Sequence, residues 1–195
     1  MNIANFIAYN LLIFIALIEI SVFIYAFEYF VCIYIRRQIP FVPSNRRSHK
    51  LLAAEINKRY PNAKLICEIG SGYGTMARFL GRNTKANVIA LENMPISVLI
   101  SKTADLFQNK SKTIKCDAFE YLDKTKQKID IGVAYLSPID STKLLKYKGK
   151  IKTLITLDFA IVDKLEPTKT IHIGHGYTLY NHKKYPHKIF IYDFE

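Results

Sequence analysis

The first 35 residues are almost continuously apolar, whereas the rest of the chain alternates short apolar runs with polar segments. The stretch from Ile3 to Ile35 exceeds the roughly 20 apolar residues that cross a hydrocarbon core. No basic residue precedes it and no small-residue cleavage site follows, so the pattern indicates an uncleaved membrane helix and not a signal peptide. We predict a transmembrane anchor over residues 1–37, with its hydrocarbon span near Phe6–Ala26.

Residues 38–47 contain two prolines and predict an extended linker. Beyond the linker, Ser48 is a candidate N-cap for a helix that continues to Tyr60. A second helix is predicted over Pro95–Asn109, because its apolar residues recur at helical spacing. Its expected core-facing residues are Ile96, Leu99, Ile100, Leu106 and Phe107.

Several other apolar runs have the length of β-strands. They are the run LICEI before Gly70, then Asn87–Asn93, Thr113–Cys116, Ile129–Leu136 and Ile151–Val162. Two final runs, Thr170–Tyr180 and Lys188–Phe194, flank a polar segment and predict a β-hairpin. Strands that alternate with helices favour a mostly parallel α/β sheet, to which the hairpin adds an antiparallel last strand. Residues 48–195 are therefore predicted to form one α/β domain.

The charge is distributed as unevenly as the hydrophobicity. The chain has 28 basic and 16 acidic residues, a formal charge of +12. Glu19 and Glu28 are the only charged residues before Arg36, so all 28 basic residues and the other 14 acidic ones follow, a charge of +14. Because basic residues follow the apolar stretch and none precedes it, the positive-inside rule orients the domain toward the cytoplasm. We predict a single-pass protein of the inner (cell) membrane that contacts the lipid bilayer through residues 3–35.

Cysteine and histidine usage argues against disulfide and metal sites. Cys32, Cys67 and Cys116 are too few and too widely spaced for a disulfide scaffold or a structural zinc site. The predicted hairpin carries His172, His175, His182 and His187. No catalytic carboxylate accompanies these histidines in the sequence, so we expect no bound metal.

The segment Glu68-Ile-Gly-Ser-Gly-Tyr-Gly74 lies where a predicted strand turns into a helix. Glycines at such a turn let the backbone approach a ligand, and the free N–H groups of the helix start face that ligand. Because the third glycine is Gly74 and Thr75 follows, the spacing departs from the dinucleotide fingerprint and disfavours NAD or FAD. No Gly-Lys-Ser/Thr follows the glycines, which excludes a P-loop.

The form E-x-G-x-G-x-G resembles motif I of the class I S-adenosylmethionine-dependent methyltransferases. Glu92 ends the second strand, where that family places an acid on the ribose hydroxyls, and Asp117 follows the third strand, where the family holds the adenine amino group. The resemblance implies a Rossmann-like class I methyltransferase sheet and S-adenosyl-L-methionine as cofactor. The cofactor-binding residues that it implies are Glu68, Gly70, Ser71, Gly72, Gly74, Glu92, Asn93, Asp117 and Ala118.

A narrower resemblance rests on shorter segments. A transmembrane stretch, then F-V-P-S (Phe41–Ser44), a short helix and a closing K-I-F-I-Y-D-F run are similar to the membrane-anchored protein-lysine methyltransferases of the ATP synthase c subunit and adenine nucleotide translocase type. This resemblance implies N-methylation of a lysine side chain in a membrane-protein substrate. Tyr135 and Ser137 follow the fourth strand, where the acceptor is expected to arrive, and are the candidate catalytic residues.

Other methyl acceptors stay open. Tyr135-Leu136-Ser137-Pro138 stands where many N-methyltransferases carry an Asn/Asp-Pro-Pro-aromatic motif, which argues against methylation of glutamine amides or exocyclic base amines. The charge of +14 leaves an RNA methyltransferase as an alternative, although a membrane anchor fits RNA poorly and nucleic acid is not the favoured partner. A lipid head-group methyltransferase and a non-catalytic membrane adaptor that kept the fold are further alternatives.

Overall fold

The computed structural model describes residues 3–31, 34, 44–108, 110–161, 165–177 and 184–194. The chain consists of two compact units, Met1–Phe41 and Val42–Glu195. Residues 38–43 of the expected linker, and with them most of the F-V-P-S segment, lie outside the described residues. The same is true of Cys32 and His182, and of Arg36 and Arg37, which contribute to the predicted orientation of the anchor.

The helix α1 (Ile3–Phe30) forms the apolar start of the chain. By length and composition its stretch Asn5–Ile24 could cross a membrane, and no other helix among the described residues could. Polar side chains on α1 bond to its own backbone: Asn10 Nδ2 donates to the Phe6 carbonyl at 2.8 Å, and Ser21 Oγ donates to the Leu17 carbonyl at 2.7 Å. Such bonds lower the cost of placing polar groups in hydrocarbon.

A seven-stranded sheet forms the centre of the second unit, in the order β3-β2-β1-β4-β5-β7-β6. The strands are β1 (Leu65–Ile69), β2 (Asn87–Glu92), β3 (Ser111–Lys115), β4 (Ile129–Ala134), β5 (Ile151–Leu157), β6 (Lys169–Tyr177) and β7 (Lys184–Asp193). Strands β1 to β5 pair in parallel, whereas β7 is antiparallel to both β5 and β6. The predicted mostly parallel, Rossmann-like sheet with an antiparallel terminal hairpin is confirmed.

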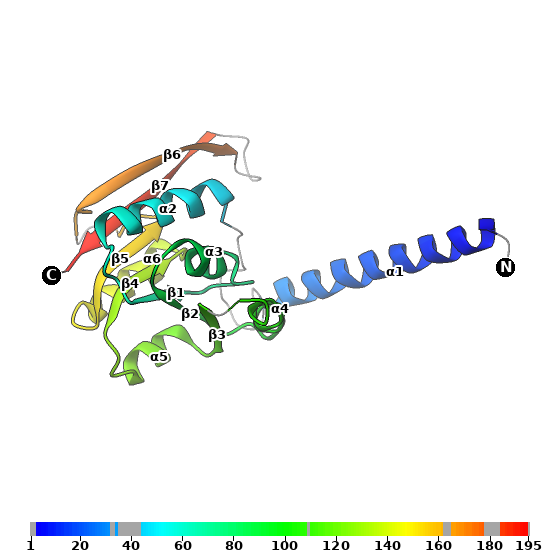
Figure 1. Cartoon of the computed structure of the whole chain (residues 1–195), viewed down its shortest axis with the longest axis horizontal. Helices are drawn as coiled ribbons and strands as arrows, with labels where there is room; N and C mark the ends of the chain where they lie inside the picture. Colours follow the sequence, from blue (N-terminus) through cyan, green and yellow to red (C-terminus); the bar gives the residue numbers. More distant parts are fainter. Residues whose placement is uncertain are drawn as a thin grey trace. The chain divides into compact units, whose positions relative to one another are not determined.

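Helices cover both faces of this sheet (Figure 1). They are α2 (Arg46–Arg59), α3 (Thr75–Asn83), α4 (Pro95–Asp105), α5 (Ala118–Lys124) and α6 (Pro138–Lys143), with a 3-10 helix, η2 (Leu144–Tyr147). On one face, Leu52 and Ile56 of α2 join Leu80 of α3 in a buried cluster. On the other face, Leu122 of α5 and Leu144 of η2 bury a second cluster. Because both faces are covered, β1 is buried along its whole length.

Several element boundaries differ from the sequence prediction by a few residues, and two of these differences have a local cause. The N-cap of α2 is Asn45 and not Ser48: Asn45 Oδ1 accepts a hydrogen bond of 2.8 Å from Ser48 N, so the helix begins at Arg46. The strand β5 ends at Leu157 and does not continue to Val162 as predicted. It ends there because Asp158 adopts a left-handed backbone with a φ of 62°, which interrupts the extended conformation.

The prediction for the inner face of α4 is wrong for four of its five residues, whereas the fifth, Ile96, is half-buried. The apolar residues Leu99, Ile100, Leu106 and Phe107, predicted to face the core, are exposed. The residues that α4 buries are Ser97, Val98 and Ser101. The reason is a polar network beneath the helix, in which Ser101 Oγ shares a hydrogen bond of 2.7 Å with Thr113 Oγ1 and accepts another from Arg78 at 3.3 Å.

Candidate functional site

The carboxyl ends of the parallel strands meet at one edge of the sheet. Ile69, which ends β1, is in register with Leu91 of β2 and with Ala134 of β4, and Ala134 is in register with Thr156 of β5. The loops after these strands therefore gather at this edge, which is where ligands bind in open parallel sheets. The predicted site residues all lie in these loops or on the strand ends that lead to them.

The glycine-rich loop connects β1 to α3 in a backbone conformation that requires its glycines. Gly70, Gly72 and Gly74 have φ values of 73°, 53° and 67°, a region that side chains disfavour. Space is also short, because a Cβ on Gly74 would lie 2.1 Å from Ser101 Oγ, and one on Gly70 would lie 2.9 Å from Leu136 Cδ2. The loop is thus closely packed against α4 on one side and the chain after β4 on the other.

The Glu92 carboxylate holds this loop against the end of β2. Its Oε2 accepts a hydrogen bond of 2.7 Å from the Gly72 N–H, and its Oε1 accepts bonds of 2.8 Å from the N–H groups of Asn93 and Met94. The Gly70 and Ser71 N–H groups both donate to the Leu91 carbonyl at 3.0 Å. The predicted cofactor residues Glu92, Gly72 and Asn93 are therefore neighbours in space.

Two polar atoms at the loop are buried without a hydrogen-bond partner within the described part of the chain, Glu68 Oε2 and Ser71 Oγ. Burial raises the pKa of Glu68 to about 8, and the nearby charge of Glu92 raises it further. A hydrogen bond from the Ala77 N–H lowers this pKa but does not cancel the effect of burial. Unsatisfied buried polar groups are costly and often mark a position that a ligand or water completes. The pair therefore fits a ligand that carries hydrogen-bond donors.

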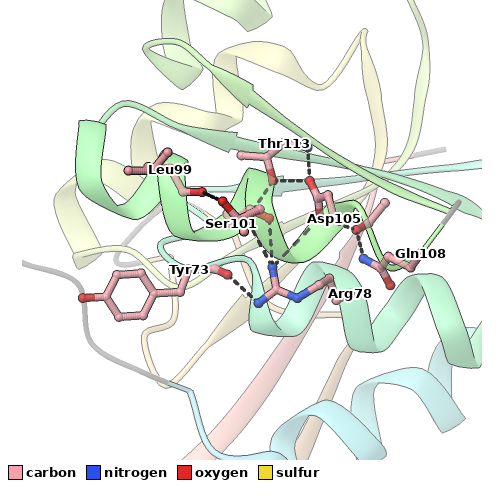
Figure 2. A network of polar contacts seen from close by, with 9 residues as sticks. Tyr73, Arg78, Leu99, Ser101, Asp105, Gln108 and Thr113 are labelled. Atoms are coloured by element: carbon pink, nitrogen blue, oxygen red, sulfur yellow. Dashed lines mark hydrogen bonds and ion pairs between the residues drawn. The ribbon is translucent and has the colours of Figure 1, made fainter. Parts of the chain in front are cut away.

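Arg78 ties the loop to α4, as Figure 2 shows. Its Nη2 donates to the Tyr73 carbonyl at 2.7 Å, and its Nη1 lies 4.0 Å from Asp105 Oδ1. Asp105 Oδ2 in turn accepts hydrogen bonds from the Thr113 N–H at 2.7 Å and the Thr113 hydroxyl at 2.6 Å. This network fixes the loop carbonyl at Tyr73 relative to the edge strand β3.

Asp117 and Ala118 stand at the junction of β3 and α5, beyond the pairing of Glu92 with Lys115. Asp117 is the N-cap of α5, and its Oδ1 accepts hydrogen bonds from the N–H groups of Phe119 at 2.8 Å and Glu120 at 3.0 Å. A shallow groove runs past its exposed side chain. The groove is lined by Asp117, Phe119, Thr142, Lys143, Leu145 and Lys146.

Tyr135 belongs to a hydrogen-bonded cluster at the ends of β4 and β5. Its hydroxyl donates to Asp158 Oδ2 at 2.8 Å, and the same oxygen lies 2.8 Å from His187 Nδ1 on β7. The Lys188 N–H donates to Asp158 Oδ1 at 3.2 Å, and the Tyr135 ring stacks on Phe159 with centroids 6.4 Å apart. Asp158 thus orients both a phenol and an imidazole at the carboxyl edge.

Ser137 has a structural contact in addition to its predicted role. It is the N-cap of α6: its Oγ accepts from the Asp140 N–H at 3.1 Å and donates to Asp140 Oδ2 at 2.9 Å. The hydroxyl that was a candidate for orienting an acceptor is therefore engaged in capping. Its catalytic role stays a prediction.

Asp158, His187 and Arg78 are site residues that the sequence analysis did not select. The sequence does contain a signal for Asp158, because this acid follows an apolar strand, as Asp117 does, and acids at strand ends are candidate site residues. His187 and Arg78 had none, since their partners are 29 and 23 residues away in the chain. Within the described residues, no group of three or more His, Cys, Asp or Glu side chains is placed to hold a metal ion.

Solved structures are similar to this protein in fold. It matches an RNA methyltransferase from Salinibacter ruber in complex with S-adenosyl-L-homocysteine over 78% of this chain and 94% of the other, with a TM-score of 0.61 and 16% identity. For a precorrin-6y C5,15-methyltransferase from Geobacter metallireducens the coverage is 78% and 90%, the TM-score 0.59 and the identity 11%. An S-adenosylhomocysteine-bound methyltransferase from Podospora anserina matches over 58% and 53%, with a TM-score of 0.53 and 19% identity.

No protein-family model matches the sequence, and no curated protein is detectably similar to it. The structural similarity nevertheless covers nearly the whole of two of these methyltransferases. The protein therefore has the class I methyltransferase fold that motif I implied. At identities of 11 to 19% the similarity establishes the fold, which enzymes with different methyl acceptors share.

Proposed function

We propose that this protein is a membrane-anchored S-adenosylmethionine-dependent methyltransferase that N-methylates a lysine side chain of a membrane protein. The observation that carries the proposal is the 2.7 Å hydrogen bond from the Gly72 N–H to Glu92, which joins the glycine-rich loop to the acid at the carboxyl edge. The unpartnered atoms Glu68 Oε2 and Ser71 Oγ support a polar ligand at the same loop.

The residues around the loop suit the parts of S-adenosylmethionine. Glu92 Oε2 accepts one hydrogen bond, from the Gly72 N–H, and keeps a lone pair for a ribose hydroxyl, whereas Oε1 already accepts from the N–H groups of Asn93 and Met94. Asp117 uses Oδ1 to cap α5 and keeps Oδ2 for the adenine amino group. When bound, the cofactor supplies a methyl group on a positively charged sulfur. The charge of Glu68, once ionised, complements that of the ligand.

The cluster around Asp158 suits the acceptor side of the reaction. A free lysine has a pKa of ~10.4, so fewer than roughly one in a thousand is neutral at pH 7 and the nitrogen must lose a proton before it attacks. A histidine that a carboxylate holds through Nδ1 is a common proton acceptor in catalysis. We assign this role to His187, and assign Tyr135 to hold the acceptor nitrogen in line.

The anchor brings the domain to its substrate. With α1 across the membrane and residues 44–194 on the cytoplasmic side, the enzyme and a membrane-protein acceptor share a thin layer, which raises their effective concentration. A small domain benefits most from such tethering. This accounts for an apolar helix and a methyltransferase fold in one chain.

RNA is the second candidate acceptor. It is favoured by the charge of +14 after residue 35 and by the similarity in fold to the RNA methyltransferase from Salinibacter ruber. Two further alternatives remain open, because a membrane anchor suits both: methylation of a lipid head group, and a non-catalytic membrane adaptor that kept the fold.

The experiment that tests the proposal is methyl transfer from radiolabelled S-adenosylmethionine. Purified full chain is incubated with membranes and RNA from cells that lack it, and the label is then separated into protein, lipid and RNA. Label released from a small membrane protein as methyl-lysine, and lost with Glu92→Ala, is the expected result. Label in lipid or RNA would show that the methyl acceptor is lipid or RNA and not a lysine. If the protein neither transfers methyl groups nor binds the cofactor, the non-catalytic adaptor is favoured.

A further inference from the structure

The helix α4 presents its apolar side chains to solvent and its serines to the protein interior. Leu99 and Ile100 on the helix are 67% and 43% exposed, and Leu106 and Phe107 just after it are 81% and 82% exposed. We call these four residues the α4 apolar face. Figure 2 shows Leu99 directed away from the side of the helix on which Ser101 meets its partners.

This orientation is fixed by strong polar contacts. Ser101 is fully buried and bonded to Thr113, and Arg78 reaches the Ser101 hydroxyl and carbonyl from α3 at 3.3 and 3.4 Å. A rotation of α4 that buried Leu99 would break these contacts and separate Arg78 from its partners on α4. The exposure of the apolar face is therefore built into the fold.

The α4 apolar face is also unusual within the second unit. Of the five large apolar side chains that are exposed in the described residues from 44 onward, four belong to it, the other being Ile139. Burial of leucine and phenylalanine side chains is favourable in proportion to the apolar area removed from water, so a cluster of four is a strong driving force for association. Exposed apolar clusters of this kind mark interaction surfaces.

The segment of chain that carries the face is basic. Between Pro95 and Cys116 the exposed charged residues are Lys102, Lys110, Lys112 and Lys115. The one acidic residue in this stretch, Asp105, is engaged with Arg78 and Thr113 and is largely buried. Exposed apolar side chains and lysines on one segment match the surface of a bilayer that contains anionic lipids, which attracts basic side chains.

The length of the chain limits how far Ser44 lies from the end of α1. The helix α1 ends at Phe30, and Ser44 is the first residue of the second unit that the structure describes. The chain between these residues reaches at most about 50 Å when fully extended. A domain held this close to a bilayer meets it at high effective concentration.

We propose that the α4 apolar face docks on the cytoplasmic surface of the anionic bilayer that α1 crosses. This inference rests on the membrane-anchor part of the proposed function. The four apolar side chains enter the interface and the lysines contact the lipid phosphates. Because α4 begins three residues after Glu92 and is about 16 Å long, docking keeps the carboxyl edge of the sheet near the membrane surface.

The test uses the full chain reconstituted in vesicles of phosphatidylcholine and phosphatidylglycerol. A bimane label on Thr103→Cys, which lies on the exposed side of α4, reports lipid contact through quenching by spin-labelled lipids. The matched control is the label on Lys126→Cys, an exposed position just after α5 on the opposite face of the sheet. Both are made with Cys32→Ser and Cys116→Ser, and Cys67 is buried.

We expect quenching at position 103 to be at least about twofold greater than at position 126, and to fall to the control value in Leu106→Glu/Phe107→Glu. These two side chains are exposed, so the thermal unfolding of the double variant should match the parent. Resistance to carbonate extraction shows that the chain is anchored in the membrane. Equal quenching at positions 103 and 126 in such a chain would contradict the docking proposal but not the membrane anchor. Release of the chain by carbonate would contradict both the membrane anchor and the docking. If the parent forms dimers and the double variant does not, the α4 apolar face binds a second copy of the chain instead of lipid.

Binding of S-adenosylhomocysteine to the same samples separates this inference from the enzymatic proposal. The double variant should bind it as the parent does, because both side chains are more than 80% exposed. Lost quenching with retained binding is therefore the expected pattern.

Discussion

The Glu92 carboxylate accepts a 2.7 Å hydrogen bond from the Gly72 N–H, 20 residues earlier in the chain. This contact joins the two sequence motifs on which the cofactor assignment depends, since one lies after β1 and the other ends β2. It also leaves Glu92 largely buried and fixed in orientation. A carboxylate preorganised in this way loses little freedom when it accepts further donors from a ligand.

Gly74→Ala should destabilise the protein by about 2 kcal/mol or more, because the new Cβ would meet Ser101 Oγ at 2.1 Å in a strained backbone region. Urea unfolding of the full chain in detergent measures the change. Gly149→Ala is the control, since no heavy atom lies within 4 Å of its Cβ position. Equal stabilities for the two variants would contradict the described packing of the loop.

Glu68 should make stability fall as pH rises. Its folded-state pKa of about 8 lies above the ordinary value of 4.5, so between these values the unfolded chain has released a proton that the folded chain retains. The free energy of unfolding should then decrease by up to about 1.4 kcal/mol per pH unit over this window. Glu68→Gln should flatten the decline, whereas Glu120→Gln, at an exposed site, should not. A decline of the same slope in Glu68→Gln would show that another group causes it.

Tyr135→Phe should slow methyl transfer by about 10- to 100-fold while leaving cofactor affinity unchanged. The variant removes the hydroxyl that donates to Asp158 and keeps the ring that stacks on Phe159. Labelled transfer to membranes measures the rate, with Tyr121→Phe on α5 as control. An unchanged rate would remove Tyr135 from the mechanism.

A protein that begins at Ser44 should keep its cofactor affinity and lose about tenfold or more of its transfer to membrane substrate. The start at Ser44 retains the Asn45 cap of α2, whose loss would cost about 1 kcal/mol. Calorimetry and labelled transfer together check this expectation. Transfer equal to that of the full chain would mean that the anchor contributes nothing to substrate selection.

The sequence was sufficient where local pattern decides structure. The strands that hold Glu68 and Glu92 are short apolar runs, and the turn that contains Gly70 and Gly74 can be formed by few other residues. The parallel sheet followed from these elements and from the hairpin. The order of the motifs then placed Glu92 and Asp117 at one edge.

Long-range polar contacts explain what the sequence could not show. The apolar residues of α4 follow helical spacing, but the guanidinium of Arg78 and the hydroxyl of Thr113 require Ser101 inside, which turns Leu99 outward. The end of β5 depends on the left-handed backbone of Asp158, which is bonded to His187 from a distant strand. Neither the contacts of Ser101 nor the hydrogen bond between Asp158 and His187 produces a regular pattern of apolar and polar residues in the sequence.

The most direct measurement is calorimetric titration of the full chain with S-adenosylhomocysteine. The account predicts saturable binding that is at least about tenfold weaker in Glu92→Ala, since hydrogen bonds to a charged group are worth about 1.5–3 kcal/mol. Glu120→Ala, an exposed acid on α5, should bind as the parent does. Absence of binding by the parent, or equal binding by Glu92→Ala, would contradict the assignment of this edge as a cofactor site.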